Sequence, residues 1–125
     1  TTKIASPRHE KTYTAKIFTT LRGSAASTSA SDAITKVQIA LRKRDSDTCI
    51  WLTGSSGNFN KSKQTKGKCS TYRWVTVTGS SSWSIKFKKK LPAAKYELRT
   101  RVTLASGAVE SSFSTKTNKS LFELR

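Results

Sequence analysis

The stretch KYELRTRVTLA, residues 95–105, decides the fold class of this chain. Every second residue is apolar except for one threonine, in the series Tyr96, Leu98, Thr100, Val102 and Leu104. The positions between them are charged or polar, in the series Glu97, Arg99, Arg101 and Thr103. A period of two residues is typical of a β-strand with one buried face and one solvent face. The stretch therefore predicts a strand.

The same alternation recurs to either side. In KVQIALRKR, residues 36–44, and in SWSIKFKKK, residues 82–90, apolar residues again alternate with polar or charged ones. Shorter candidate strands cover residues 3–5, 15–23, 49–52, 73–79 and 120–124. Turn-forming residues separate them, and the Ser/Thr density of residues 25–34 favours a loop over a helix. Seven or eight short antiparallel strands at this spacing predict an all-β sandwich, as a single domain over residues 1–125.

The charge of the chain is its second strong feature. Twenty-four Lys and Arg residues stand against seven Asp and Glu residues, which gives a formal net charge of +17. Such an excess indicates polyanionic surroundings, such as nucleic acid, an acidic cell-wall polymer or an anionic membrane surface. The alternative is a protein kept soluble by self-repulsion. No apolar run approaches the roughly 18 residues of a membrane span.

The only two cysteines, Cys49 and Cys69, close a loop of Gly, Ser, Asn and Lys. A zinc site needs about four Cys or His ligands, and the only histidine, His9, is distant in the sequence. A redox pair would usually have the spacing C-x-x-C. The favoured interpretation is a disulfide, which indicates a compartment outside a reducing cytosol. Two unpaired buried thiols are the alternative.

Two lysine clusters are candidate polyanion-binding sites. The first lies in the loop between the cysteines, around Phe59, and comprises Lys61, Lys63, Lys66 and Lys68. The second comprises Lys86, Lys88, Lys89 and Lys90. Nearby aromatic residues, including Tyr72 and Trp74, could stack on the bases of a single-stranded nucleic acid. The competing interpretation is that these aromatic side chains belong to the core.

The sequence contains none of the common catalytic or nucleotide-binding motifs. It contains no G-x-G-x-x-G, Walker, H-E-x-x-H or G-x-S-x-G motif. The close pair Asp45 and Asp47 is interpreted as turn-forming. We therefore expect a protein that is not an enzyme and that has no cofactor and no metal site.

Several motifs in order resemble a known family. They are KIASPRHEKTYTAKIFTTLRGSAAS, then ITKVQIALRKRD, CIWL, and KCSTYRWVTVTGSSSWSIKFKKKLPAAKYELRTRVTLASGAVE. Together they cover nearly the whole chain and are similar to bacterial immunoglobulin-like (fibronectin type III-like) modules of secreted and cell-surface proteins. The resemblance implies an immunoglobulin-like β-sandwich with one disulfide.

The resemblance also assigns structural roles. Cys49 and Cys69 match the family's disulfide pair, Trp83 its core tryptophan, and Tyr96 a tyrosine corner whose hydroxyl bonds to nearby backbone. The family's acidic residue before the last turn is absent, and Ala108 stands where its Asn would be. Calcium binding, known in some related modules, is therefore not expected.

The functional expectation is a non-enzymatic structural or adhesive module, secreted or at the cell surface. It could be the subunit of a surface filament, formed when residues 1–5 or 120–124 insert beside a neighbouring subunit's open strand. The simpler possibility is that both segments complete their own sheets. The alternative function is a polyanion-binding module that acts through its basic surface.

Overall fold

The structure is a computed structural model, and it describes residues 1–27, 29–44, 48–65, 69 and 71–125. For residues 48 and 61–65 the backbone alone is described. The strands are β1 (Thr2–Ser6), β2 (Thr12–Tyr13), β3 (Thr20–Ala25), β4 (Ile34–Lys43), β5 (Thr48–Leu52), β6 (Phe59–Thr65), β7 (Val75–Gly79), β8 (Ser82–Lys86), β9 (Ala94–Leu104) and β10 (Lys119–Leu124). No helix occurs among these residues, which include residues 25–27 and 29–34.

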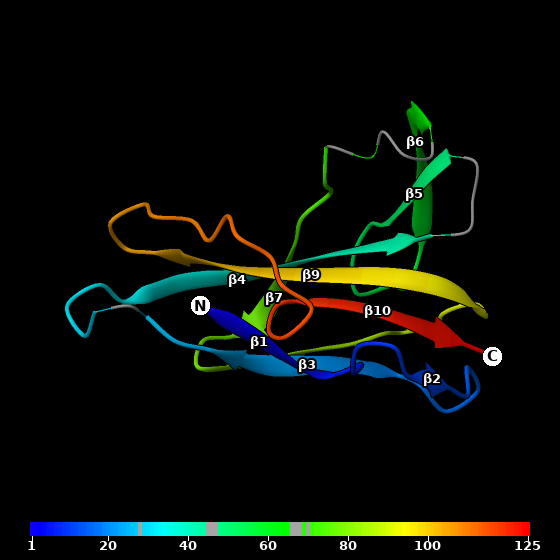
Figure 1. Ribbon diagram of the computed structural model, residues 1–125, viewed down its shortest axis with the longest axis horizontal. Coiled ribbons are helices and arrows are strands. Elements are labelled where there is room, and N and C mark those ends of the chain that lie inside the picture. The colour runs from blue at the N-terminus through cyan, green and yellow to red at the C-terminus, as the bar shows by residue number, and fades with distance from the viewer. Residues whose placement is uncertain (28, 45–47, 66–68, 70) are drawn as a thin grey trace.

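All of these strands belong to one curled sheet (Figure 1). Its path runs β1-β3-β8-β7-β4-β9-β10-β2, and the β5–β6 hairpin branches off β4. The pairs are antiparallel except for β10 with β2, which is parallel, so the sheet is mixed. The result is a half-barrel whose concave side encloses the core.

The prediction of an immunoglobulin-like sandwich of two sheets is therefore wrong, although the all-β class is confirmed. The deciding element is β7, because its two halves pair with different strands. Val75–Val77 pair with β4, whereas Thr78 and Gly79 pair with β8. Main-chain hydrogen bonding between strands thus continues without a break from β4 through β7 to β8. Alternation shows which face of a strand is buried, but it does not show whether two layers are joined through a shared strand.

The core follows from the predicted alternation. The apolar series of β9 points into the curl, where Tyr96 and Leu98 are fully buried. Trp83 lies in the same cluster, and its indole donates a hydrogen bond of 3.2 Å to the Ser24 carbonyl oxygen. The Tyr96 hydroxyl donates one of 2.5 Å to the Pro92 carbonyl oxygen. Each of these large side chains therefore has a polar partner for its buried donor.

A second, smaller layer covers the convex face of β4 and β9. The predicted disulfide is present there and joins Cys49 of β5 to Cys69, with 5.8 Å between their Cα atoms. Cys49 packs with Ala40 and Trp51, and the half-buried side chains Tyr72 and Trp74 lie against them. The central strands are therefore covered on both faces.

The two ends of the chain lie in the sheet. β1 pairs with β3, and β10 lies between β9 and β2. Phe122 and Leu124 of β10 are buried in the core. In this structure, residues 120–124 complete the protein's own sheet, which is the simpler of the two arrangements expected.

Candidate functional site

A basic cleft forms where the β5–β6 hairpin meets the connection from β8 to β9. It has a volume of about 370 Å³ and is lined by Lys43, Gly57, Phe59, Lys89, Lys90 and Pro92. No carboxylate belongs to this lining. We call it the lysine cleft.

The lysine cleft contains part of the second predicted cluster. Lys86, Lys88, Lys89 and Lys90 are all exposed, and two of them line the cleft. From the first cluster, Lys61 and Lys63 lie on β6, in the part of that strand for which the backbone alone is described. Lys66 and Lys68 lie outside the described residues. The structure places Phe59, the aromatic residue among the lysines of the first cluster, beside Lys89 and Lys90.

Lys43 was missed by the sequence analysis, although the sequence contains a signal for it. The residue continues the inward phase of Val37, Ile39 and Leu41 at the end of β4, where a lysine is unexpected. Its Nζ lies 4.8 Å from the centre of the Phe59 ring, in cation–π geometry. A long side chain at the end of an apolar row can pack its stem inward and present its charge at the surface.

The backbone around the lysine cleft is held by specific contacts. Gly57 has a φ of 85°, and a Cβ added there would lie 2.8 Å from the Lys89 carbonyl oxygen. The Lys88 amide donates a hydrogen bond of 3.0 Å to the Ser55 carbonyl oxygen. The hairpin turn and the lysine-rich connection are therefore in direct contact, and glycine is required where they meet.

The carboxylates that have a basic partner among the described residues lie away from the lysine cleft. Glu97 takes three of the nearby cations, at 3.4 Å from Arg42, 3.6 Å from Arg99 and 3.7 Å from Lys119. Glu123 contacts Arg125, and Glu10 contacts His9. No described carboxylate lies within 4.0 Å of a cleft lysine. The positive charge of the lysine cleft is thus not neutralised by the described part of the chain.

The aromatic residues near the lysines hold the second layer onto the sheet. The Arg99 guanidinium lies 4.6 Å from the Tyr72 ring centre and 5.1 Å from that of Phe113. Arg101 lies 4.1 Å from the Trp74 ring centre, and burial lowers the pKa of its guanidinium. These rings already stack on the protein's own cations, which leaves less of their surface for nucleic-acid bases.

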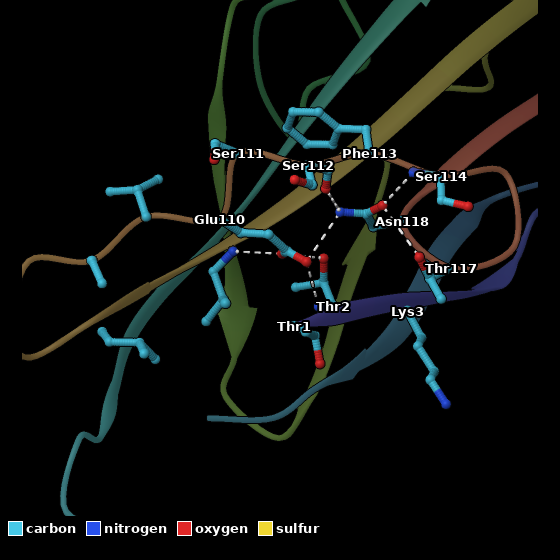
Figure 2. Close-up of a pocket in the computed structure, with 14 residues that line it drawn as sticks. Thr1, Thr2, Lys3, Glu110, Ser111, Ser112, Phe113, Ser114, Thr117 and Asn118 are labelled. Atoms are coloured by element: carbon cyan, nitrogen blue, oxygen red, sulfur yellow. Dashed lines mark hydrogen bonds between the residues drawn. The ribbon is translucent and has the colours of Figure 1, made fainter. Parts of the chain in front are cut away.

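A larger cavity lies between β1 and the connection from β9 to β10, and Figure 2 shows it. Its volume is about 550 Å³. Apolar walls come from Val102, Leu104, Ala108, Val109 and Phe113, and hydroxyl groups come from the serines and threonines around it. We call it the Glu110 cavity, after the acidic residue in its lining.

The Glu110 carboxylate accepts four hydrogen bonds. The donors are the Thr2 hydroxyl at 2.7 Å, the Thr2 amide at 3.1 Å, the Asn118 amide group at 3.1 Å and the Val102 amide at 3.3 Å. Every donor is neutral, and no base of the described residues lies within 4.0 Å of this carboxylate. Lys3, which also lines the cavity, points away from Glu110 in Figure 2.

The described residues contain no candidate metal site, and the histidine has a structural contact. No group of three or more His, Cys, Asp or Glu residues that could hold a metal occurs among the described residues. His9 has a structural contact, because its Nδ1 accepts a hydrogen bond of 3.1 Å from the Leu121 amide. The predicted turn formers Asp45 and Asp47 lie outside the described residues. Over the described ranges, no helix is long and apolar enough to cross a membrane.

No protein-family model matches the sequence, and no curated protein matches it.

Proposed function

We propose that this protein is a non-enzymatic module that binds anionic polymers through the lysine cleft. The observation that carries the proposal is the gathering of Lys43, Lys89 and Lys90 around one hollow with no carboxylate in its lining. Solubility alone requires only a net charge away from zero, with the charges spread over the surface. Solubility does not require that a lysine of β4 share a cleft with two lysines of the connection from β8 to β9.

The binding mode follows from what the cleft offers. Lysine ammonium groups are compact charges on flexible stems, and they suit repeated phosphate, sulfate or carboxylate groups along a polymer. The Phe59 ring has Lys43 near it and the Tyr96 ring at 5.9 Å, so it is not an open stacking platform. Recognition is therefore electrostatic and tolerant of polymer sequence, with affinity that falls steeply as salt rises.

Location outside a reducing cytosol is part of the same proposal. The disulfide between Cys49 and Cys69 supports it, because such bonds persist in oxidising compartments. Acidic cell-wall or matrix polymers are then the natural ligands. Strand exchange by residues 120–124 is less favoured as a function, since β10 already has a strand partner on each side.

The test compares two variants of equal charge. In the cleft variant Lys43, Lys89 and Lys90 become Gln; in the control, the exposed Lys3, Lys11 and Lys116 become Gln. Affinity for heparin and for a 20-nucleotide single-stranded DNA is measured by fluorescence anisotropy over a salt series. We expect the cleft variant to bind at least ten-fold more weakly at 0.15 M salt. Its slope of log K against log salt for the DNA should be smaller by roughly 2.

The control variant should lose less affinity and keep most of the slope. Equal losses in the two variants would show that binding depends on overall charge and would overturn the assignment to the lysine cleft. Wild-type affinity that does not change between 0.05 and 0.5 M salt would contradict the electrostatic mechanism itself.

A further inference from the structure

The two exposed large hydrophobic side chains among the described residues are Ile17 and Val109. Ile17 is 78% exposed, and Val109 is 44% exposed at the Glu110 cavity. Single exposed apolar residues are ordinary on protein surfaces. Here, however, one of them protrudes and the other lies in the lining of an apolar hollow.

Ile17 protrudes from a turn that is firmly held. The amides of Ile17 and Phe18 donate hydrogen bonds of 3.1 and 3.2 Å to the Thr14 carbonyl oxygen. The Ala15 amide donates to the Arg125 carbonyl oxygen at 2.8 Å, and Phe18 is buried directly after the turn. We call residues 14–17 the Ile17 turn. Because its backbone is fixed, little conformational entropy would be lost on docking.

The charges next to these two features are complementary. Lys16 is exposed beside Ile17 and has no carboxylate within 4.0 Å among the described residues. Glu110 in the cavity likewise has no base within 4.0 Å among the described residues. Lys3, in the same lining, points away from it in Figure 2, and the Thr1 α-amino group donates its hydrogen bond to the Ala26 carbonyl oxygen. On the turn, an ammonium group lies next to the apolar Ile17 side chain. In the cavity, the Glu110 carboxylate lies next to an apolar wall, so the two surfaces are complementary in both polarity and charge.

The two features cannot meet within one molecule. In Figure 1 the chain leaves β2 for the Ile17 turn near the C-terminus, whereas the start of β1 lies to the left, beside the N label. The first residues of β1 line the cavity. A contact between them must join two copies. Because each copy has one turn and one cavity on different surfaces, the contact is head-to-tail and can repeat.

We propose that the Ile17 turn of one copy docks into the Glu110 cavity of a second copy, so that the protein forms open-ended head-to-tail chains. Ile17 lies against the apolar wall at Val109 and Val102, and Lys16 faces the Glu110 carboxylate. The contact is small, so its Kd is on the order of 0.1–1 mM. It becomes populated where copies are concentrated. It does not use the lysine cleft and does not depend on the proposed polymer binding.

Sedimentation equilibrium in 0.5 M NaCl tests association up to about 2 mM protein, since repulsion between the +17 copies is then screened within about 4 Å. The average mass should rise with concentration beyond that of a dimer. Ile17→Asp and Val109→Asp should each remain monomeric. Asn60→Asp, which adds the same charge at an exposed site on β6, should associate like the wild type.

Mixing the two inactive variants gives the decisive result. Ile17→Asp retains a cavity and Val109→Asp retains a turn, so together they should form a one-to-one dimer that grows no further. With the Val109→Asp chain labelled by ¹⁵N, amide shifts should appear at residues 14–18. With the Ile17→Asp chain labelled, they should appear at residues 108–113.

A wild-type protein that is monomeric at about 2 mM overturns the proposal. So does a mixture of the two variants that shows no dimer while the wild type associates, because the contact would then lie elsewhere. Association of either single variant alone would have the same meaning. Thermal unfolding of each variant confirms that it is folded; if Val109→Asp is not, Ala108→Glu serves as the cavity variant.

Discussion

The Thr2 hydroxyl donates a hydrogen bond of 2.7 Å to the carboxylate of Glu110, a residue 108 positions later in the sequence. The same carboxylate accepts from the Thr2 amide and from the Val102 amide of β9. A single side chain thus connects the outward edge of β1 to β9 and to the connection that leads to β10. It also covers an amide that an incoming strand could otherwise pair with.

Replacing Glu110 with Ala should lower the free energy of unfolding by about 2–4 kcal/mol, because buried donors lose their acceptor. Glu110→Gln should cost about half as much, since its amide oxygen still accepts. Urea denaturation measures both. Glu10→Gln, at an exposed carboxylate, is the control and should change little. If Glu110→Ala and Glu10→Gln had the same small effect, the bridge would not contribute to stability.

Replacing both Cys49 and Cys69 with Ser should lower the free energy of unfolding by about 2–4 kcal/mol, since the unfolded chain regains the freedom of the intervening loop. The denaturant midpoint of the double variant reports the change. Wild-type protein in reducing agent should approach the same midpoint. An unchanged midpoint for the variant would argue that the crosslink does not stabilise the fold.

The Tyr96 hydroxyl bond to the Pro92 carbonyl oxygen should be worth about 1 kcal/mol. Tyr96→Phe removes it and leaves the ring stacked on Phe122. Tyr72→Phe is a matched control, because the Tyr72 ring is packed while its hydroxyl has no hydrogen bond among the described residues. Chemical denaturation should separate the two variants. Equal denaturation midpoints for the two variants would mean that the Tyr96 hydrogen bond stabilises the fold no more than hydration of the hydroxyl stabilises the unfolded chain.

Two glycines in the same turn should respond differently to substitution. Gly57→Ala forces a Cβ to within 2.8 Å of the Lys89 carbonyl oxygen at a φ of 85°. It should cost about 1–2 kcal/mol and also weaken heparin binding, because the lysine cleft must widen. Gly54→Ala meets nothing within 4 Å and should leave both quantities near wild type. Normal heparin binding by Gly57→Ala would show that the cleft geometry is not needed for the polymer.

The sequence predicted the burial of individual strands better than their connection. Alternation in residues 95–105 correctly placed Tyr96 and Leu98 in the core. It could not reveal that β7 pairs with both β4 and β8. The alternation of side chains depends on which face is buried and not on which strand each half of β7 is hydrogen-bonded to. β6 was missed because its residues after Phe59 are all polar and include Asn and Lys, which are depleted in strands. Its pairing with β5 determines the strand instead.

The candidate sites were predictable only in part. Lys89 and Lys90 belong to a predicted cluster because they are close in the sequence to Lys86 and Lys88. Lys43 joins these two lysines only through the fold. Glu110 gave no sequence signal, since its partners Thr2 and Asn118 are brought to it by β1 and by the connection before β10. A site whose residues come from distant segments of the sequence can be predicted only when the strand pairing and register of the sheet are known.

The parallel pairing of β2 with β10 determines when the fold can be completed during synthesis. Thr12 and Tyr13 pair with Glu123 and Leu124, so this early segment has no strand partner in β10 until residues much later in the sequence have been synthesised. Until those residues leave the ribosome, the nascent chain carries an unfinished, strongly cationic sheet. Such long-range closure slows folding and lengthens the period in which the chain depends on its charge to avoid aggregation.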